Sequence, residues 1–265
     1  MGADRLAELE LEARREAALQ TVTAELSAAR AAAEQSRAEA EALLRFNEVV
    51  AGILAHDLKN PLAAILMNAR LLRDADAERA RTVGARIVTS GERMSRMIDQ
   101  ILEWTRLRAG AGWVHLTRAA CDLGALTDEA VVELRGRKAD AAVVVEASGD
   151  LRGSWDADRL AQVISNLVGN GLDHASSPGV RVTLDGSGAQ VRLAVKNTGT
   201  IDDDFLPLVF EPFRGRTAGV KSRGRGLGLG LYITRQIVLA HGGTVEVERG
   251  PEGTVTFVVT LPREP

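Results

Sequence analysis

"LAHDLKNPLAA" at residues 54–64 places a proline inside a run that otherwise favours helix, next to a histidine, an aspartate and an asparagine. A proline in a helix interior costs roughly 3 kcal/mol, because it lacks an N–H group and its ring crowds the preceding turn. Pro61 cannot donate to the carbonyl of Asp57, so we expect the helix to bend one turn beyond His56. Asn60 follows His56 by four residues and shares its helical face. Alone, the segment leaves open a helix end, a surface histidine or a reactive site.

The segment lies in a predicted helical hairpin over residues 47–110. Its first helix continues to about residue 73, and apolar residues at helical spacing predict a second helix over 77–108. One hairpin cannot bury its apolar stripe on both sides, so we expect two chains to pair into a four-helix bundle. The glycine-containing "AGAGW" at 109–113 predicts a domain boundary.

Residues 3–46 contain no Gly or Pro and are dominated by Ala, Glu, Arg and Leu, a composition that favours helix. Apolar and small residues recur three and four apart, at Leu19, Val22, Leu26, Ala29, Ala33, Ser36, Ala40 and Leu43. This spacing predicts a coiled coil that favours parallel pairing of two chains. A single solvated helix remains the alternative.

The character of the sequence changes after residue 113. Short β-rich runs, several with period-two alternation, predict strands at 142–147, 180–185, 191–197, 243–249 and 254–262. Helical patterns fall at about 123–138, 157–173 and 229–241. Strands and helices mixed in this way predict an α/β sandwich, a sheet with helices on one face.

Composition narrows the classes of function. A net charge of −3 gives no general reason to expect nucleic acid or a membrane surface as partner. The single Cys121 excludes an internal disulfide framework. No apolar stretch approaches the roughly 20 residues that span a bilayer, and the acidic N-terminus does not resemble a signal peptide. We therefore expect a cytoplasmic chain without a membrane segment.

"SNLVGNGLDHA" carries two asparagines, Asn166 and Asn170, that share one face of an otherwise apolar helix. Asparagine is a mediocre helix former, so the pair indicates a function. The amide oxygens suit a hard cation such as Mg²⁺, although solvated polar positions would give the same pattern.

"VKNTGTID" at 195–202 ends a strand with polar residues. Asn197 or its neighbours could receive the edge of a nucleobase, and Gly199 would let the backbone approach a ligand closely. An ordinary end of a strand would look the same.

"GRGLGLGLYITRQIVLAHGG" leads alternating glycines and leucines into a helix. Backbone amides at such a helix N-terminus form an anion site suited to phosphate. The preceding "FRGRTAGVKSRGRG" at 213–226 contains five basic residues and no acid, which is typical of a solvated loop or of a lid over phosphates.

Together these pieces resemble the cytoplasmic core of a sensor histidine kinase over about residues 46–263. "HDLKNPL" resembles the phosphoacceptor motif, "NLVGN" the Mg²⁺-binding asparagine motif and "NTGTI" the adenine-binding motif, while "FEPF" and "GLGLGLYI" are similar to the segments that flank the lid. The resemblance implies a coiled-coil signalling helix (1–46), a dimerisation and phosphotransfer hairpin (47–112) and a Bergerat-type ATP-binding domain (113–265).

The resemblance implies a homodimer that autophosphorylates His56 from Mg²⁺–ATP and passes the phosphoryl group to an aspartate of a response regulator. Asp57 would accept or orient the proton on the other ring nitrogen of His56, Asn60 would position a water for phosphatase activity, and Asn170 would hold the metal. The residues expected to bind ATP are Asn166, Asn170, Asn197, Gly199, Arg214, Lys221, Arg223, Gly226, Leu227, Gly228, Leu229 and Gly230.

The chain departs from the family pattern at the nucleobase. Asn197 stands where the family has an aspartate, so an amide carbonyl replaces a charged acceptor, and the segment is one residue short after Thr200. Two alternatives follow: a dimeric nucleotide-binding scaffold without catalysis, and an ATPase or serine kinase of the same fold. The other histidines, His115, His174 and His241, lack the context of His56 and are interpreted as structural.

Overall fold

The computed structural model describes residues 57–72, 76–108, 115–137, 142–176, 179–214, 227–251 and 253–264, with scattered positions between 20 and 55. The chain divides into two compact units, residues 1–56 and 57–265, each described here by itself. In the first unit the described positions are helical, Arg30 pairs with Glu34 one turn away, and Leu26 is 68% exposed. The coiled coil and the boundaries at 46 and 112 stay predictions.

The second unit begins with the two helices expected from the sequence. Residues 57–72 are helical through the buried Pro61, and α2 runs over Ala77–Arg108. Asp76 caps the start of α2 by accepting from the backbone N–H of Arg79 at 2.8 Å. Large apolar side chains on both helices stay exposed in the single chain, among them Leu62, Leu66, Leu71, Val88, Ile98 and Leu102. The hairpin therefore leaves an apolar stripe uncovered.

A five-stranded sheet follows, and it confirms all five predicted strands. Its order is β2-β4-β5-β7-β6, with β2 parallel to β4 and the other neighbours antiparallel. The strands are β2 (Val143–Gly149), β4 (Val180–Gly186), β5 (Gln190–Thr198), β6 (Thr244–Gly250) and β7 (Thr254–Pro262). A second sheet pairs β1 (Ala119–Asp122) with β3 (Arg152–Trp155) and was not predicted, because each of its strands has only four residues.

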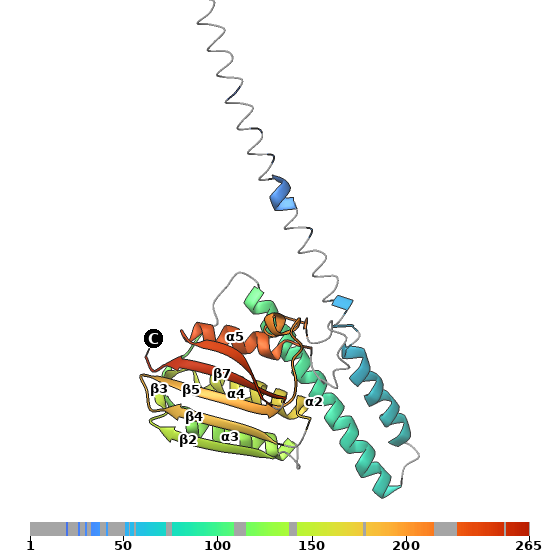
Figure 1. Cartoon of the computed structure of the whole chain (residues 1–265). Helices are drawn as coiled ribbons and strands as arrows, with labels where there is room; N and C mark the ends of the chain where they lie inside the picture. Colours follow the sequence, from blue (N-terminus) through green and yellow to red (C-terminus); the bar gives the residue numbers. More distant parts are fainter. Residues whose placement is uncertain are drawn as a thin grey trace, which may run out of the picture. The chain divides into compact units, whose positions relative to one another are not determined.

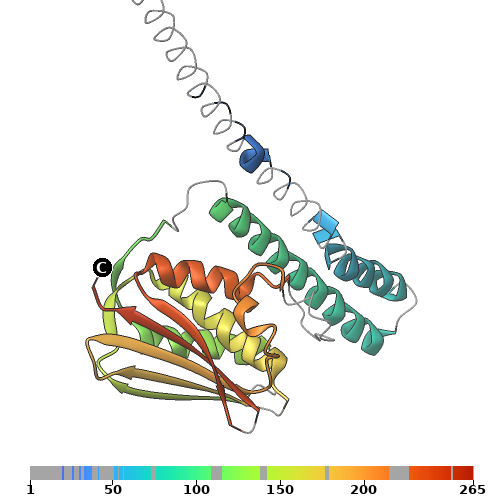
Figure 2. The same ribbon diagram turned by 45° about the horizontal axis from the view of Figure 1, so that its top comes forward.

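Three helices cover one face of the large sheet (Figures 1 and 2), as the predicted sandwich requires. They are α3 (Leu123–Arg137), α4 (Ala157–His174) and α5 (Gly230–Ala240), while η1 (Leu206–Leu208) forms a single 3₁₀ turn. Alternate residues of the strands are buried, as in β4 and β5, and α4 buries Leu160, Val163, Ile164, Leu167, Val168 and Gly171. Most of the core is aliphatic, in keeping with the small number of aromatic residues, and Trp155 and Phe257 are among the buried aromatic side chains.

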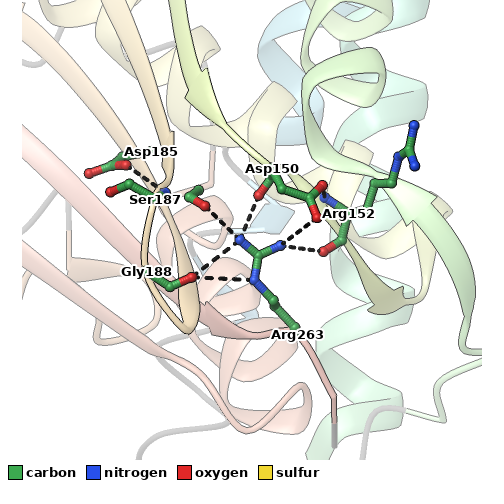
Figure 3. A network of polar contacts seen from close by, with 7 residues as sticks. Asp150, Arg152, Asp185, Ser187, Gly188 and Arg263 are labelled. Carbon is green, nitrogen blue, oxygen red and sulfur yellow. Dashed lines mark hydrogen bonds and ion pairs between the residues drawn. The ribbon is translucent and has the colours of Figure 1, made fainter.

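Arg263 joins the end of the chain to two turns of the sheet (Figure 3). Its guanidinium donates to the backbone carbonyls of Asp150 at 2.6 Å, Arg152 at 2.7 Å and Gly186 at 2.7 Å, and more weakly to Gly188 at 3.3 Å. A planar fork with five N–H groups suits this convergence, whereas a lysine ammonium could not span it. The contact stabilises the edge of the domain that lies after β2 and β4.

Candidate functional site

α4 carries the asparagine pair. The helix begins at a true N-cap, where the Asp156 carboxylate accepts from the backbone N–H of Arg159 at 3.1 Å. Its apolar residues turn toward the core, and this leaves Asn166 and Asn170 half-buried one turn apart, as their spacing predicted.

The two asparagines differ in their contacts. The Asn166 side-chain amide donates to the backbone carbonyl of Gly230 at 3.3 Å, at the first residue of α5. Among the residues that the structure describes, none hydrogen-bonds the Asn170 amide. Asn166 therefore ties the middle of α4 to the first residue of α5.

The turn that leads into α5 combines a glycine with two buried leucines. Gly228 has φ +72°, a conformation that side chains rarely adopt, and Leu227 and Leu229 are completely buried. Leu229 is the N-cap of α5 and offers no side-chain acceptor to the first-turn N–H groups. These donors suit an anion such as phosphate, while the leucines contribute backbone and core rather than ligand contacts.

Asn197 lies beneath the last turns of α4. It is 6% exposed, and its Nδ2 donates to the backbone carbonyl of Thr198 at 3.2 Å. A Cβ added at Gly171 would lie 3.6 Å from Asn197 Cβ, and one at Gly199 would lie 3.1 Å from Asn197 Nδ2. Glycines on both sides thus let β5 and α4 approach each other at the position expected to meet a nucleobase.

Phe213 ends the "FEPF" segment and adopts φ +63°, which is unusual for a residue with a side chain. Its backbone N–H donates to the carbonyl of Gly228 at 3.1 Å. This hydrogen bond joins the first residue of the basic segment 213–226 to the turn that follows the segment. Its ring meets Trp104 of α2 edge to face at 5.1 Å. The neighbouring Glu103 pairs with Arg159 near the start of α4, so α2 contacts the nucleotide domain at two points.

Several predicted site residues lie outside the described residues or make no contact that tests their role. His56, Lys221, Arg223 and Gly226 lie outside the described residues. Arg214 is exposed; of the two residues beside the acceptor, Asp57 is 5% exposed and Asn60 is exposed on the helix surface. The structure therefore brings together Asn166 with Gly230 and Asn197 with Gly199, and leaves the roles of the other predicted residues as expectations.

Sequence reasoning missed a polar cluster at the far end of α4 and α5. His241 is completely buried between the backbone N–H of Asp156, 3.1 Å from its Nε2, and the carbonyl of Ile237, 2.8 Å from its Nδ1. Burial lowers the pKa of His241 below its ordinary 6.5. An aspartate directly before a helical pattern was the available signal.

The residues present fit Mg²⁺ and ATP. The described residues contain no group of three or more His, Cys, Asp or Glu side chains that could hold a metal. Mg²⁺ bound to a nucleotide usually takes only one or two protein oxygens and completes its shell with phosphates and water. The amide oxygen of Asn170 and the uncapped N-terminus of α5 supply what such a site needs.

Comparison with family models agrees with this arrangement. Residues 47–110 match the His Kinase A (phospho-acceptor) domain, and residues 155–265 match the histidine kinase-, DNA gyrase B- and HSP90-like ATPase family. The first model covers the hairpin through α2, and the second begins at the end of β3 and covers α4, α5 and the four strands from β4 to β7.

Curated relatives are similar over most of the chain. The bacteriophytochrome of Pseudomonas aeruginosa is 34% identical over 221 residues, which is 82% of this chain and 30% of the relative. The sensor protein VanS of Enterococcus faecium is 34% identical over 230 residues, which is 83% of this chain and 58% of VanS. The chain thus spans between about a third and just over half the length of these relatives.

Two solved structures have similar folds. Histidine kinase ThkA, solved in complex with response regulator TrrA, is 26% identical with TM-score 0.58, over 79% of this chain and 59% of the other. Full-length ShkA, solved with AMPPNP, is 27% identical with TM-score 0.56, over 81% of this chain and 45% of the other.

Proposed function

Because this chain belongs to the sensor histidine kinase family, we propose that it transfers the γ-phosphoryl group of ATP to His56 and then to a response regulator. The observation that carries the proposal is the hydrogen bond from Asn166 to Gly230, which holds α4 at the uncapped N-terminus of α5 one helical turn before Asn170. A metal ligand and a phosphate-binding helix end in one place are what a bound nucleoside triphosphate requires.

In the proposed complex, the first-turn amides of α5 bind phosphate oxygens, and the basic segment 213–226 covers them. Asn170 would hold Mg²⁺, and the bound ion would neutralise phosphate charge. Asn197 accepts from the nucleobase through Oδ1, since its Nδ2 already donates to Thr198.

At the acceptor, a neutral ring nitrogen of His56 forms a bond to the γ-phosphorus while the bond to the bridging oxygen breaks and ADP leaves. Asp57 accepts or orients the proton on the other ring nitrogen. Asn60, which is exposed on the same helix, positions a water molecule for the phosphatase activity. Positioning and charge neutralisation supply most of the catalysis.

The proposal includes two kinds of partner. A second copy of the chain would cover the exposed apolar residues of the hairpin and extend the pairing into the coiled coil predicted over residues 1–46. The response regulator would receive the phosphoryl group on its own aspartate, and ThkA was solved with such a partner. Since ATP is the donor, we place the reaction in the cytoplasm. None of the described helices has both the length and the apolar character needed to cross a bilayer.

Radiolabelled ATP tests the proposal. We expect the wild-type chain to acquire label that is labile in acid and stable in base, and His56→Gln to acquire none, because a phosphoramidate bond hydrolyses in acid. Acid-stable label, or label that survives His56→Gln, would instead support a serine kinase. ATP binding without any label would support the scaffold.

A further inference from the structure

Hydrogen bonds that involve a side chain connect α4 and α5, with their cap residues, at both ends of α5. Near the proposed phosphates, the Asn166 amide donates to Gly230 at 3.3 Å. At the far end, the backbone N–H of Asp156 donates to Nε2 of His241 at 3.1 Å. Along each helix these contacts lie roughly 15 Å apart at 1.5 Å per residue, so the helices run antiparallel (Figure 2, yellow and orange).

The ring of His241 fits this position in one protonation state only. Its Nδ1 lies 2.8 Å from the carbonyl of Ile237 and must carry a proton to bond it, which leaves Nε2 as the acceptor for Asp156. In the imidazolium form Nε2 would also carry a proton and would face the N–H of Asp156 donor to donor. A buried donor left without a partner is costly, so protonation opens this contact.

The same end of the two helices is fastened to the segment that follows the predicted domain boundary. The backbone N–H of Thr117 donates to the Asp156 carboxylate at 2.7 Å, and the Arg118 guanidinium donates to the carbonyl of Ala240 at 3.0 Å. Arg118 and Asp156 are also the charged groups that act on His241. Burial has the largest effect and lowers the pKa of His241; the charge of Arg118 lowers this pKa further, and the charge of Asp156 raises it. Residues 117 and 118 thus hold the start of α4 and the end of α5 together.

We propose that His241 is a positioning residue for the nucleotide site: in its neutral form it holds α4 against α5, with Thr117 and Arg118, and thereby sets Asn170 relative to the N-terminus of α5. The proposal rests on the nucleotide site proposed above. It makes nucleotide binding depend on the protonation of a residue at the opposite end of α5 from the phosphates.

The test measures the affinity of the full chain for Mg²⁺ and a non-hydrolysable ATP analogue between pH 7.5 and 5.0. His56→Gln is the parent, so that titration of the acceptor has no influence. In His241→Gln the amide oxygen can still accept from Asp156 and does not titrate, whereas His241→Leu removes the acceptor. At pH 7.5 we expect the Gln variant to bind within about twofold of the parent and the Leu variant about tenfold more weakly, as loss of a buried partner predicts.

The pH series separates positioning from simple stability. The analogue and the other groups titrate in the same way in the parent and in the Gln variant. The dissociation constant of the parent divided by that of the Gln variant therefore isolates His241. We expect this ratio to rise at least threefold as the pH falls from 7.5 to 5.0. A constant ratio, or a Leu variant that melts earlier but binds like the parent well below its melting temperature, would overturn the proposal.

If His241→Leu does not fold, Thr117→Pro removes the N–H that bonds Asp156 and also fixes the backbone angle φ at residue 117, and Thr117→Ala is the control for loss of the threonine side chain. The Pro variant should bind the analogue several-fold more weakly than the Ala variant, and equal binding would overturn the proposal. Failure of the parent itself to bind would refute the proposed nucleotide site, a result distinct from equal binding among variants.

Discussion

Gly169 and Gly171 lie two residues apart in α4 and have different surroundings. A Cβ at Gly169 would meet no heavy atom within 4 Å, whereas one at Gly171 would lie 3.1 and 3.4 Å from the methyl groups of Val180 and 3.6 Å from Asn197 Cβ. Alanine at these two positions therefore separates the helical preference of the residue from the fit of α4 against the sheet.

The magnitudes follow from two opposing effects. Alanine in a helix interior is favoured over glycine by about 1 kcal/mol, so Gly169→Ala should raise the free energy of unfolding by about that amount. At Gly171 the same gain is opposed by overpacking, typically about 1–3 kcal/mol, because Val180 begins β4 and is held by its pairing with β2 and β5. We expect Gly171→Ala to be less stable than Gly169→Ala by about 1–3 kcal/mol.

Urea unfolding followed by circular dichroism measures this difference, and titration calorimetry with an ATP analogue measures the second consequence. Because the new methyl group would press on Val180, which pairs with Asn197 across β4 and β5, Gly171→Ala should bind nucleotide several-fold more weakly, while Gly169→Ala should bind like the wild type. If the two variants are equally stable and bind equally well, α4 is not confined by Val180 and Asn197, and the geometry of the site described above is wrong.

Three further predictions concern single side chains. Arg263→Ala should lower the free energy of unfolding by about 2–4 kcal/mol in urea titrations, because four backbone carbonyls lose a shared charged donor, without changing nucleotide affinity. Asn197→Asp should lower the free energy of unfolding by about 1–3 kcal/mol, since a carboxylate would face the Thr198 carbonyl. Calorimetry should nevertheless show roughly fivefold tighter ATP binding, because the acceptor for the nucleobase would be charged. Because the pKa of His241 is lowered in the folded chain, the unfolded chain binds more protons below about pH 6.5, and the free energy of unfolding should fall toward pH 5.0. Urea titrations at pH 7.5 and 5.0 should show a smaller fall in His241→Gln.

The parts of the fold that depend on local periodicity could be predicted from the sequence. Alternation in β4 and β5 and the apolar spacing of α4 identify their buried faces without knowledge of any partner. The hairpin helix α2 was predicted with both of its ends, because a polar stretch precedes it and a glycine-containing stretch follows it. The dimeric bundle and the coiled coil depend on a second chain and stay predictions.

Contacts between distant segments could not be predicted in this way. The four-residue strands β1 and β3 are too short for a periodic signal, and they pair only because the fold brings them together. His241 was interpreted as structural because it lacks the sequence context of His56. Its partner, Asp156, lies 85 residues earlier, and no local pattern connects the two. The contact of Trp104 with Phe213 likewise joins two elements that no motif connects.

The asparagine motif shows what such long-range contacts change. In the sequence Asn166 and Asn170 are equivalent, since both are amides on one face of one helix. In the fold, α5 places its first residue against only one of them, across a separation of 64 residues, and a Cβ at Gly230 would lie 3.5 Å from Asn166 Oδ1. Asn166 therefore positions the helix end that would bind phosphate, and Asn170 retains the oxygen that would bind the metal. Because one hydrogen bond joins these two functions, substitution of Asn166 should disturb the phosphate site and the metal site together, whereas substitution of Asn170 should affect the metal first.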